Sequence, residues 1–163
     1  MTNDPLDVFR PDLLPNHTVF VTGGGSGINL GVALAFARLG AAVGLCGRNE
    51  QRLADAAERL KQAGAKAVST TPADVREPQA IEAALDASRE ALGDLDTLVC
   101  GAAGNFGATA EELTPNGFRS VVDIDLNGSF HSCQAAFDQL RSTDGSIIMI
   151  SAPQAIAPYV GQA

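Results

Sequence analysis

Residues 18–28, with the sequence TVFVTGGGSGI, decide the fold of this chain. Residues 18–22 are a short run rich in β-branched side chains, which is typical of a buried strand, and glycines follow it at once. Residues 29–39 then repeat apolar side chains at helical spacing, from Leu30 to Ala37. A strand, a glycine-rich turn and a helix form the first half of a βαβ unit. The sequence therefore predicts a parallel α/β fold that begins here.

The same alternation continues along the chain. Four further strands are predicted at residues 42–46, 66–70, 97–100 and 146–150, and three further helices at 50–62, 78–92 and about 117–141. Strands that alternate with helices form parallel sheets with right-handed crossovers. We therefore predict an α/β fold, a doubly wound parallel sheet of the Rossmann type, in a single domain over residues 1–163. Because such sheets commonly have six strands and this pattern supplies five, we interpret the C-terminal part of the domain as missing.

Composition narrows the class of protein. The 163 residues are 45% apolar and 18% charged, which suits a packed core, and the net charge of −8 argues against nucleic acid or an anionic membrane as partner. No apolar run approaches the ~20 residues of a membrane span, and the acidic first 15 residues do not resemble a signal peptide. Three widely spaced cysteines fit neither a disulfide framework nor a metal site. We expect no metal and a reducing, cytoplasmic location.

The glycine-rich turn is predicted to hold the pyrophosphate of a dinucleotide. A tight turn, a close approach of the backbone and N–H groups at a helix start all suit that ligand. The regular G-x-G-x-x-G spacing is not met, so a flexible turn is the alternative, but the position after the first strand favours a dinucleotide. The predicted cofactor contacts in this turn are Thr22, Gly23, Gly25, Ser26, Gly27 and Ile28.

The end of the second strand predicts which nicotinamide cofactor is bound. An acidic residue there would bond both ribose hydroxyls and repel a 2′-phosphate. This chain has Arg48 instead, with Arg52 one helical turn later. A guanidinium without a carboxylate favours NADP(H) over NAD(H). The alternative is that Arg48 only solvates the loop.

Three motifs together resemble the short-chain dehydrogenase/reductase family. Residues 22–28 resemble its Thr-Gly-x-x-x-Gly-x-Gly turn, with Asn29 in the place of the third glycine. Asp74 and Val75 resemble the pair that contacts the adenine, and residues 100–106 resemble the motif after the fourth strand. That motif is Asn-Asn-Ala-Gly in most members, from which Cys100 and Gly101 depart. The resemblance implies further cofactor contacts at Asp74, Val75, Ala102, Ala103 and Gly104.

A narrower resemblance is to peroxisomal-type 2,4-dienoyl-CoA reductases and their bacterial relatives. It is carried by residues 9–14, by Ala-Ala-Gly-Asn-Phe at 102–106 and by Asp-Ile-Asp at 123–125. It implies an acyl-CoA substrate, with Arg48 and Arg76 near the CoA moiety, Phe106 along the acyl chain and residues 114–116 at the mouth of the site. The substrate residues that we predict are Arg48, Arg76, Asn105, Phe106, Thr114 and Asn116. For Arg76 the alternative is a loop charge without a ligand.

The residues for catalysis differ from those of a carbonyl reductase. Ser151 matches the family's serine, but Tyr159 lies too near it to match the family's tyrosine, and both lysines, Lys61 and Lys66, lie upstream. The helical pattern places Asp125 within the apolar arc of the predicted helix at 117–141, where a carboxyl is costly unless it has a partner. The resemblance implies that this aspartate, with a lysine from the next helix, holds a water that protonates the substrate. The alternative is a structural acid that holds a backbone turn.

Three hypotheses about function follow. We favour NADPH-dependent reduction of a 2,4-dienoyl-CoA, with Asp125 and Ser151 as catalytic residues. An ordinary short-chain carbonyl or alcohol oxidoreductase would use the same glycine turn. A nucleotide-binding module without chemistry would explain the irregular motifs. The resemblance also implies that the protein forms a homo-oligomer. The helical pattern places His131 on the polar side of its helix, so we expect it to face solvent.

Overall fold

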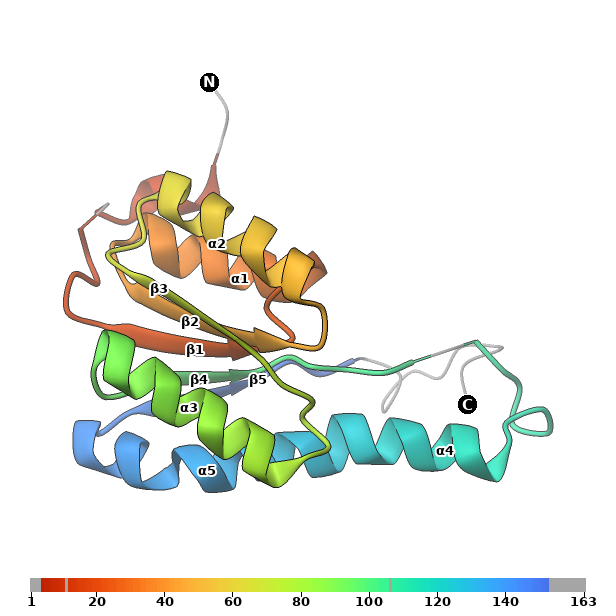
Figure 1. The fold of residues 1–163 in the computed structure, drawn as a ribbon. Helices are drawn as coiled ribbons and strands as arrows, with labels where there is room; N and C mark the ends of the chain where they lie inside the picture. Colours follow the sequence, from red (N-terminus) through yellow and green to blue (C-terminus); the bar gives the residue numbers. More distant parts are fainter. Residues whose placement is uncertain (1–3, 11, 106, 153–163) are drawn as a thin grey trace.

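The computed structural model describes residues 4–10, 12–105 and 107–152. Five parallel strands form one sheet in the order β3-β2-β1-β4-β5 (Figure 1). The strands are β1 (Thr18–Thr22), β2 (Ala42–Gly47), β3 (Val68–Pro72), β4 (Thr97–Cys100) and β5 (Ser146–Met149). The helices are η1 (Pro5–Val8), α1 (Gly27–Arg38), α2 (Glu50–Ala63), α3 (Pro78–Leu92), α4 (Pro115–Val121), the π-helical η2 (Val122–Asn127) and α5 (Gly128–Thr143). The predicted doubly wound parallel sheet is confirmed.

The order of the strands reverses between β1 and β4. From β1 the chain moves outward through β2 to β3, then crosses back to β4 on the other side of β1 and continues to β5. Figure 1 shows α1 and α2 on one face of the sheet and α3 and α5 on the other. In such sheets the loops after neighbouring strands diverge at the reversal, which leaves a crevice at the carboxyl ends of the strands.

Each face of the sheet has its own hydrophobic core. Val19 and Val21 pack with the apolar sides of α1 and α2, whereas Phe20, between them in the sequence, packs with α3 and α5. Side chains alternate between the two faces of a strand, and every residue of β1 is buried because both faces are covered. β1 is therefore rigidly held, and the turn that follows it starts from a fixed point.

The first helix begins at Gly27 rather than at residue 29, and two further elements differ from the prediction. The third strand was expected at 66–70 and lies at Val68–Pro72, where Val68 pairs in register with Val43. The single helix expected at 117–141 extends from Pro115 to Thr143 and is interrupted by η2. It starts earlier because the Thr114 hydroxyl caps it by accepting a hydrogen bond from the Gly117 N–H at 3.0 Å. The π turn changes the angle between successive side chains.

The expected apolar arc of this helix is therefore only partly buried. Four large apolar side chains of this arc are exposed to solvent: Phe118 by 61%, Leu126 by 67%, Phe130 by 60% and Phe137 by 59%. α5 instead buries Gly128, Ser132, Ala136, Gln139 and Leu140. A constant 100° per residue does not hold through a π turn, and α4 extends beyond the sheet (Figure 1). Every residue of β5 is exposed as well. Within the described residues, no helix is both long and apolar enough to cross a membrane.

Candidate functional site

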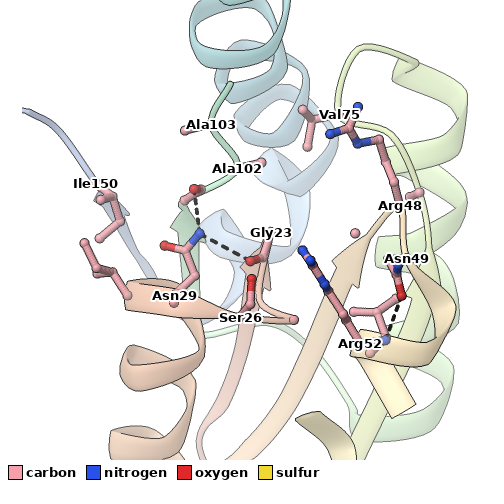
Figure 2. Close-up of a pocket in the computed structure, with 17 residues that line it drawn as sticks. Gly23, Ser26, Asn29, Arg48, Asn49, Arg52, Val75, Ala102, Ala103 and Ile150 are labelled. Atoms are coloured by element: carbon pink, nitrogen blue, oxygen red, sulfur yellow. Dashed lines mark hydrogen bonds between the residues drawn. The ribbon is translucent and has the colours of Figure 1, made fainter. Parts of the chain in front are cut away.

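A cavity of about 910 Å³ lies at the carboxyl ends of β1, β2 and β4, where the strand order reverses (Figure 2). Of the predicted cofactor residues, it brings together Gly23, Gly25, Ser26, Gly27, Ile28, Arg48, Val75, Ala102 and Ala103. It is also lined by Asn29, Gly47, Asn49, Arg52, Leu53, Ala73, Gly101 and Ile150. Thus most of the sequence-predicted contacts, which are spread over about 80 residues of chain, surround one space.

The glycine-rich turn forms one wall of this cavity. Gly27 has φ +59, and a Cβ placed there would meet nothing within 4 Å. Ser26 is the N-cap of α1 with an extended backbone, and its hydroxyl makes no capping hydrogen bond. The start of α1 therefore points its positive dipole end toward the cavity without a side-chain cap, which is the arrangement that binds phosphate in other nucleotide sites.

Two arginines form the opposite wall. Arg48 follows β2, and Arg52 lies in the first turn of α2. Asn49 caps α2 by accepting a hydrogen bond from the Arg52 N–H at 2.8 Å, which fixes where both arginines leave the backbone. Figure 2 shows the Arg52 side chain extending toward Ser26. Among the described residues that line the cavity there are these two cations and no carboxylate.

Asp74 and Arg76 bind each other at the turn after β3. The Arg76 Nη2 lies 2.6 Å from Asp74 Oδ2, and the Arg76 Nε lies 3.0 Å from Oδ1. The hydrogen bond from the Arg76 side chain is the main cause that lowers the pKa of Asp74, and the charge of Arg48 adds to it. Val75, between them, lines the cavity, but Asp74 and Arg76 do not. Asp74 was predicted to contact the cofactor and Arg76 the substrate, and each would have to make that contact in addition to, or in place of, this ion pair.

His131 holds the same turn from the other side. Its Nδ1 lies 3.0 Å from the carbonyl oxygen of Val75, and its side chain is half-buried. The expectation that His131 faces solvent is wrong, because α5 packs closely against α3 and the turn before it. The contact joins residues 56 positions apart, and no local pattern of the sequence indicates it.

Thr22 lies beneath the cavity rather than in its wall. It is buried, and its Oγ1 accepts hydrogen bonds from the N–H groups of Gly101 and Ala102 at 3.1 and 3.2 Å. It therefore joins the turn after β1 to the loop after β4. Gly104, which also does not line the cavity, donates its N–H to Asp125 Oδ1 at 2.7 Å.

Asp125 lies on η2, half-buried beside the loop after β4. Its bond to Gly104 is what the structural alternative predicted, a carboxylate that holds a backbone turn. The same bond also gives the carboxylate a fixed direction, and π turns are frequent at functional sites. Ser151 is exposed and follows Ile150, which lines the cavity and donates its N–H to the Cys100 carbonyl at 3.0 Å. Both predicted catalytic residues thus lie at the carboxyl edge of β4 and β5.

The predicted substrate residues on α4 lie apart from the cavity. Thr114 and Asn116 are exposed; Thr114 caps α4, and Asn116 Oδ1 accepts a hydrogen bond from Arg119 at 3.0 Å. Asn105 is exposed on the loop after β4, and Phe106 lies outside the described residues. The structure therefore groups the predicted cofactor contacts but leaves these substrate contacts dispersed.

The cysteines lie under the site as small apolar side chains. Cys46 and Cys100 are buried, and burial raises the pKa of each thiol to about 12. The Sγ atoms of Cys100 and Cys133 lie 3.8 Å apart without a disulfide. At neutral pH the thiols of Cys46 and Cys100 therefore stay protonated and pack as small apolar side chains.

Comparison with known proteins agrees with this geometry. The family model described as short chain dehydrogenase matches residues 17–163. The chain is 41% identical over 153 residues to a protein of Arabidopsis thaliana named peroxisomal 2,4-dienoyl-CoA reductase, covering 88% of this chain and 51% of that protein. It is 40% identical over 123 residues to a probable 2,4-dienoyl-CoA reductase of Bacillus subtilis, covering 76% of this chain and 48% of that protein. The chain thus spans about half the length of these relatives.

A solved structure shares the fold. The chain superimposes with a TM-score of 0.87, at 28% identity, on an NADPH-bound short chain oxidoreductase of Pseudomonas aeruginosa described as containing an atypical catalytic center, covering 93% of this chain and 60% of that one. Three findings agree on the same family. They are the strand order that reverses between β1 and β4, the start of α1 without a side-chain cap at the glycine turn, and the family match over residues 17–163. The chain belongs to the short-chain dehydrogenase family.

Proposed function

We propose that the full-length protein is an NADPH-dependent oxidoreductase that reduces a 2,4-dienoyl-CoA. The observation that supports it most is the cavity at the carboxyl ends of β1, β2 and β4, whose described lining holds Arg48, Arg52 and no carboxylate. A carboxylate beside the ribose would repel a 2′-phosphate, whereas guanidinium groups bind phosphate in a bidentate manner. The lining therefore fits NADP(H) better than NAD(H).

Separate groups of residues hold the proposed cofactor. The turn at residues 25–27 and the start of α1 receive the pyrophosphate, and Arg48 and Arg52 receive the 2′-phosphate. Val75, Ala102 and Ala103 border the remaining part of the cavity. When bound, NADPH supplies the hydride that reduces the substrate.

Asp125 is the residue that we propose to position the proton donor. The Gly104 N–H fixes one carboxylate oxygen, so the carboxylate is oriented beside the loop after β4. In the proposed reaction it holds a water that gives its proton to the α-carbon of the thioester, with a lysine from a following helix as the second partner implied by the family resemblance. The Ser151 hydroxyl orients the thioester carbonyl.

The substrate class rests on the relatives and on the family resemblance. The relatives from Arabidopsis and Bacillus carry the name 2,4-dienoyl-CoA reductase. The family resemblance implies that Arg48 and Arg76 lie near the CoA moiety, where the charges of Asp74, Glu77 and Asp123 also act on Arg76. CoA carries several phosphates, and the turn after β3 is where we propose that they bind.

The test follows by absorbance the oxidation of NADPH by the native full-length protein, and the reduction of NADP+ where the substrate is an alcohol. We expect turnover with a 2,4-dienoyl-CoA and little with simple ketones, aldehydes or alcohols. Turnover of a ketone or alcohol alone would replace this substrate by that of a carbonyl oxidoreductase. Tight NADPH binding without turnover of any of them would favour a binding module without chemistry.

Two expectations accompany this proposal. On the family resemblance, we propose that the full-length protein forms a homo-oligomer. The cytoplasmic location stays a prediction from cysteine usage, and the Arabidopsis relative is named peroxisomal. Size-exclusion chromatography with light scattering tests the first, and fluorescence microscopy of the tagged native protein tests the second.

A further inference from the structure

Asn29 joins two loops that meet under the cavity. Its Nδ2 donates hydrogen bonds to the carbonyl oxygen of Gly101 at 2.6 Å and to that of Gly23 at 3.3 Å. Figure 2 shows its carboxamide between the turn after β1 and the loop after β4. These residues are 72 and 6 positions away from Asn29 in the sequence. One side chain of α1 therefore spans the point where the strand order reverses.

Gly101 is shaped to this side chain. A Cβ at Gly101 would lie 2.3 Å from Asn29 Oδ1 and 2.5 Å from Asn29 Cγ. Real Cβ atoms do not approach other atoms so closely, so any larger residue at position 101 must displace the carboxamide. The Gly101 N–H is at the same time bound by Thr22 Oγ1. The peptide groups of Gly101 are thus held on both sides, by Thr22 and by Asn29.

Asn29 and Gly101 are also two of the positions where the sequence departs from the family pattern. Asn29 stands in the place of the third glycine, and Gly101 lies in the motif after β4. The contact between them explains both departures as one change: the side chain added at position 29 occupies the space that the absent side chain at position 101 leaves.

We propose that Asn29 is a positioning residue, which fixes the loop after β4 against the glycine turn and so sets the floor of the cavity for the cofactor. The effect of Asn29 on cofactor binding rests on the function proposed above, in which this cavity binds NADPH. The amide is suited to the task because its NH₂ group carries two donors for two carbonyl oxygens. Without it, these partly buried carbonyls lose their donor, and the loop at 101–104 keeps only its bonds to Thr22 and Asp125.

A double-mutant cycle in the native full-length protein tests the proposal. We expect Gly101→Ala to weaken NADPH binding tenfold or more and to lower the Tm of the cofactor-free protein by roughly 5 °C. In an Asn29→Gly background, the Cβ added by Gly101→Ala meets no carboxamide. We therefore expect the loss of NADPH affinity and the fall in Tm to be a small fraction of those in the wild-type background. Gly31→Ala is the matched control, because a Cβ there meets nothing within 4 Å and its effect is the same in both backgrounds.

A second variant keeps the test decisive if Gly101→Ala does not fold. Asn29→Asp has the same shape but sets a carboxylate against two carbonyl oxygens, so we expect weaker NADPH binding than in Asn29→Gly. Equal effects of Gly101→Ala in the two backgrounds, or wild-type behaviour of Asn29→Asp, would overturn the proposal. If the wild type binds no NADPH, the proposed function fails, but rescue of the Tm in the cofactor-free protein still decides the role of Asn29.

Discussion

β4 and β5 are neighbours in one sheet, but their surroundings are opposite. Leu98 on β4 and Ile147 on β5 are register partners, and Leu98 is fully buried whereas Ile147 is 45% exposed. The β1–β4 side carries helices on both faces and holds the cavity, while the β5 side, with α4, exposes apolar surface and bears Ser151. Within the described residues, the cofactor end of the site therefore lies on the covered part of the sheet and is held by hydrogen bonds, whereas Ser151 follows an exposed strand.

The largest effect separates these regions by stability. Leu98→Ala in the 163-residue chain removes a fully buried side chain and should lower the free energy of unfolding by about 2–5 kcal/mol. Ile147→Ala at its register partner should cost less than about 1.5 kcal/mol, because nearly half of that side chain already contacts water. Urea unfolding measures both. Equal costs would show that β5 is as well covered as β4.

The next effect separates binding from catalysis. Asp125→Asn in the native full-length protein keeps an oxygen that can accept the Gly104 hydrogen bond but cannot take part in proton transfer. We expect kcat to fall roughly 100-fold or more while the affinity for NADPH stays close to wild type. Steady-state kinetics with a dienoyl-CoA measures the first and calorimetry the second. A kcat close to wild type would leave Asp125 with the structural role alone.

The smallest effect concerns the ion pair beside the cavity. Because Arg76 lowers the pKa of Asp74, the pair stabilises the fold above the ordinary pKa of an aspartate, and that contribution is lost as the pH falls through the lowered value. Both side chains are partly exposed, so the gain is small. We expect Asp74→Asn to lower the Tm slightly at pH 7, with a smaller difference near pH 3. A difference that grows on acidification would have the wrong sign.

Features that depend on neighbouring residues could be predicted from the sequence, whereas contacts between residues far apart in the sequence could not. The turn at residues 22–28 and the arginine at 48 were found because a strand, a glycine cluster and a helix are local patterns. The exposure of Phe130 and Phe137 was missed because an apolar pattern shows which side chains share one side of a helix but not how much of that side another element covers. The bonds of Asn29 to Gly101 and of His131 to Val75 join distant parts of the chain, so only the folded structure brings them together.

The most direct test of the account is calorimetric titration of the native full-length protein with NADPH and with NADH, beside its Arg48→Ala variant. We predict that NADPH binds at least tenfold more tightly than NADH, a difference of about 1.4 kcal/mol, and that Arg48→Ala removes most of this preference while NADH binding changes little. Binding of neither cofactor, a preference for NADH, or an unchanged preference in Arg48→Ala would contradict it.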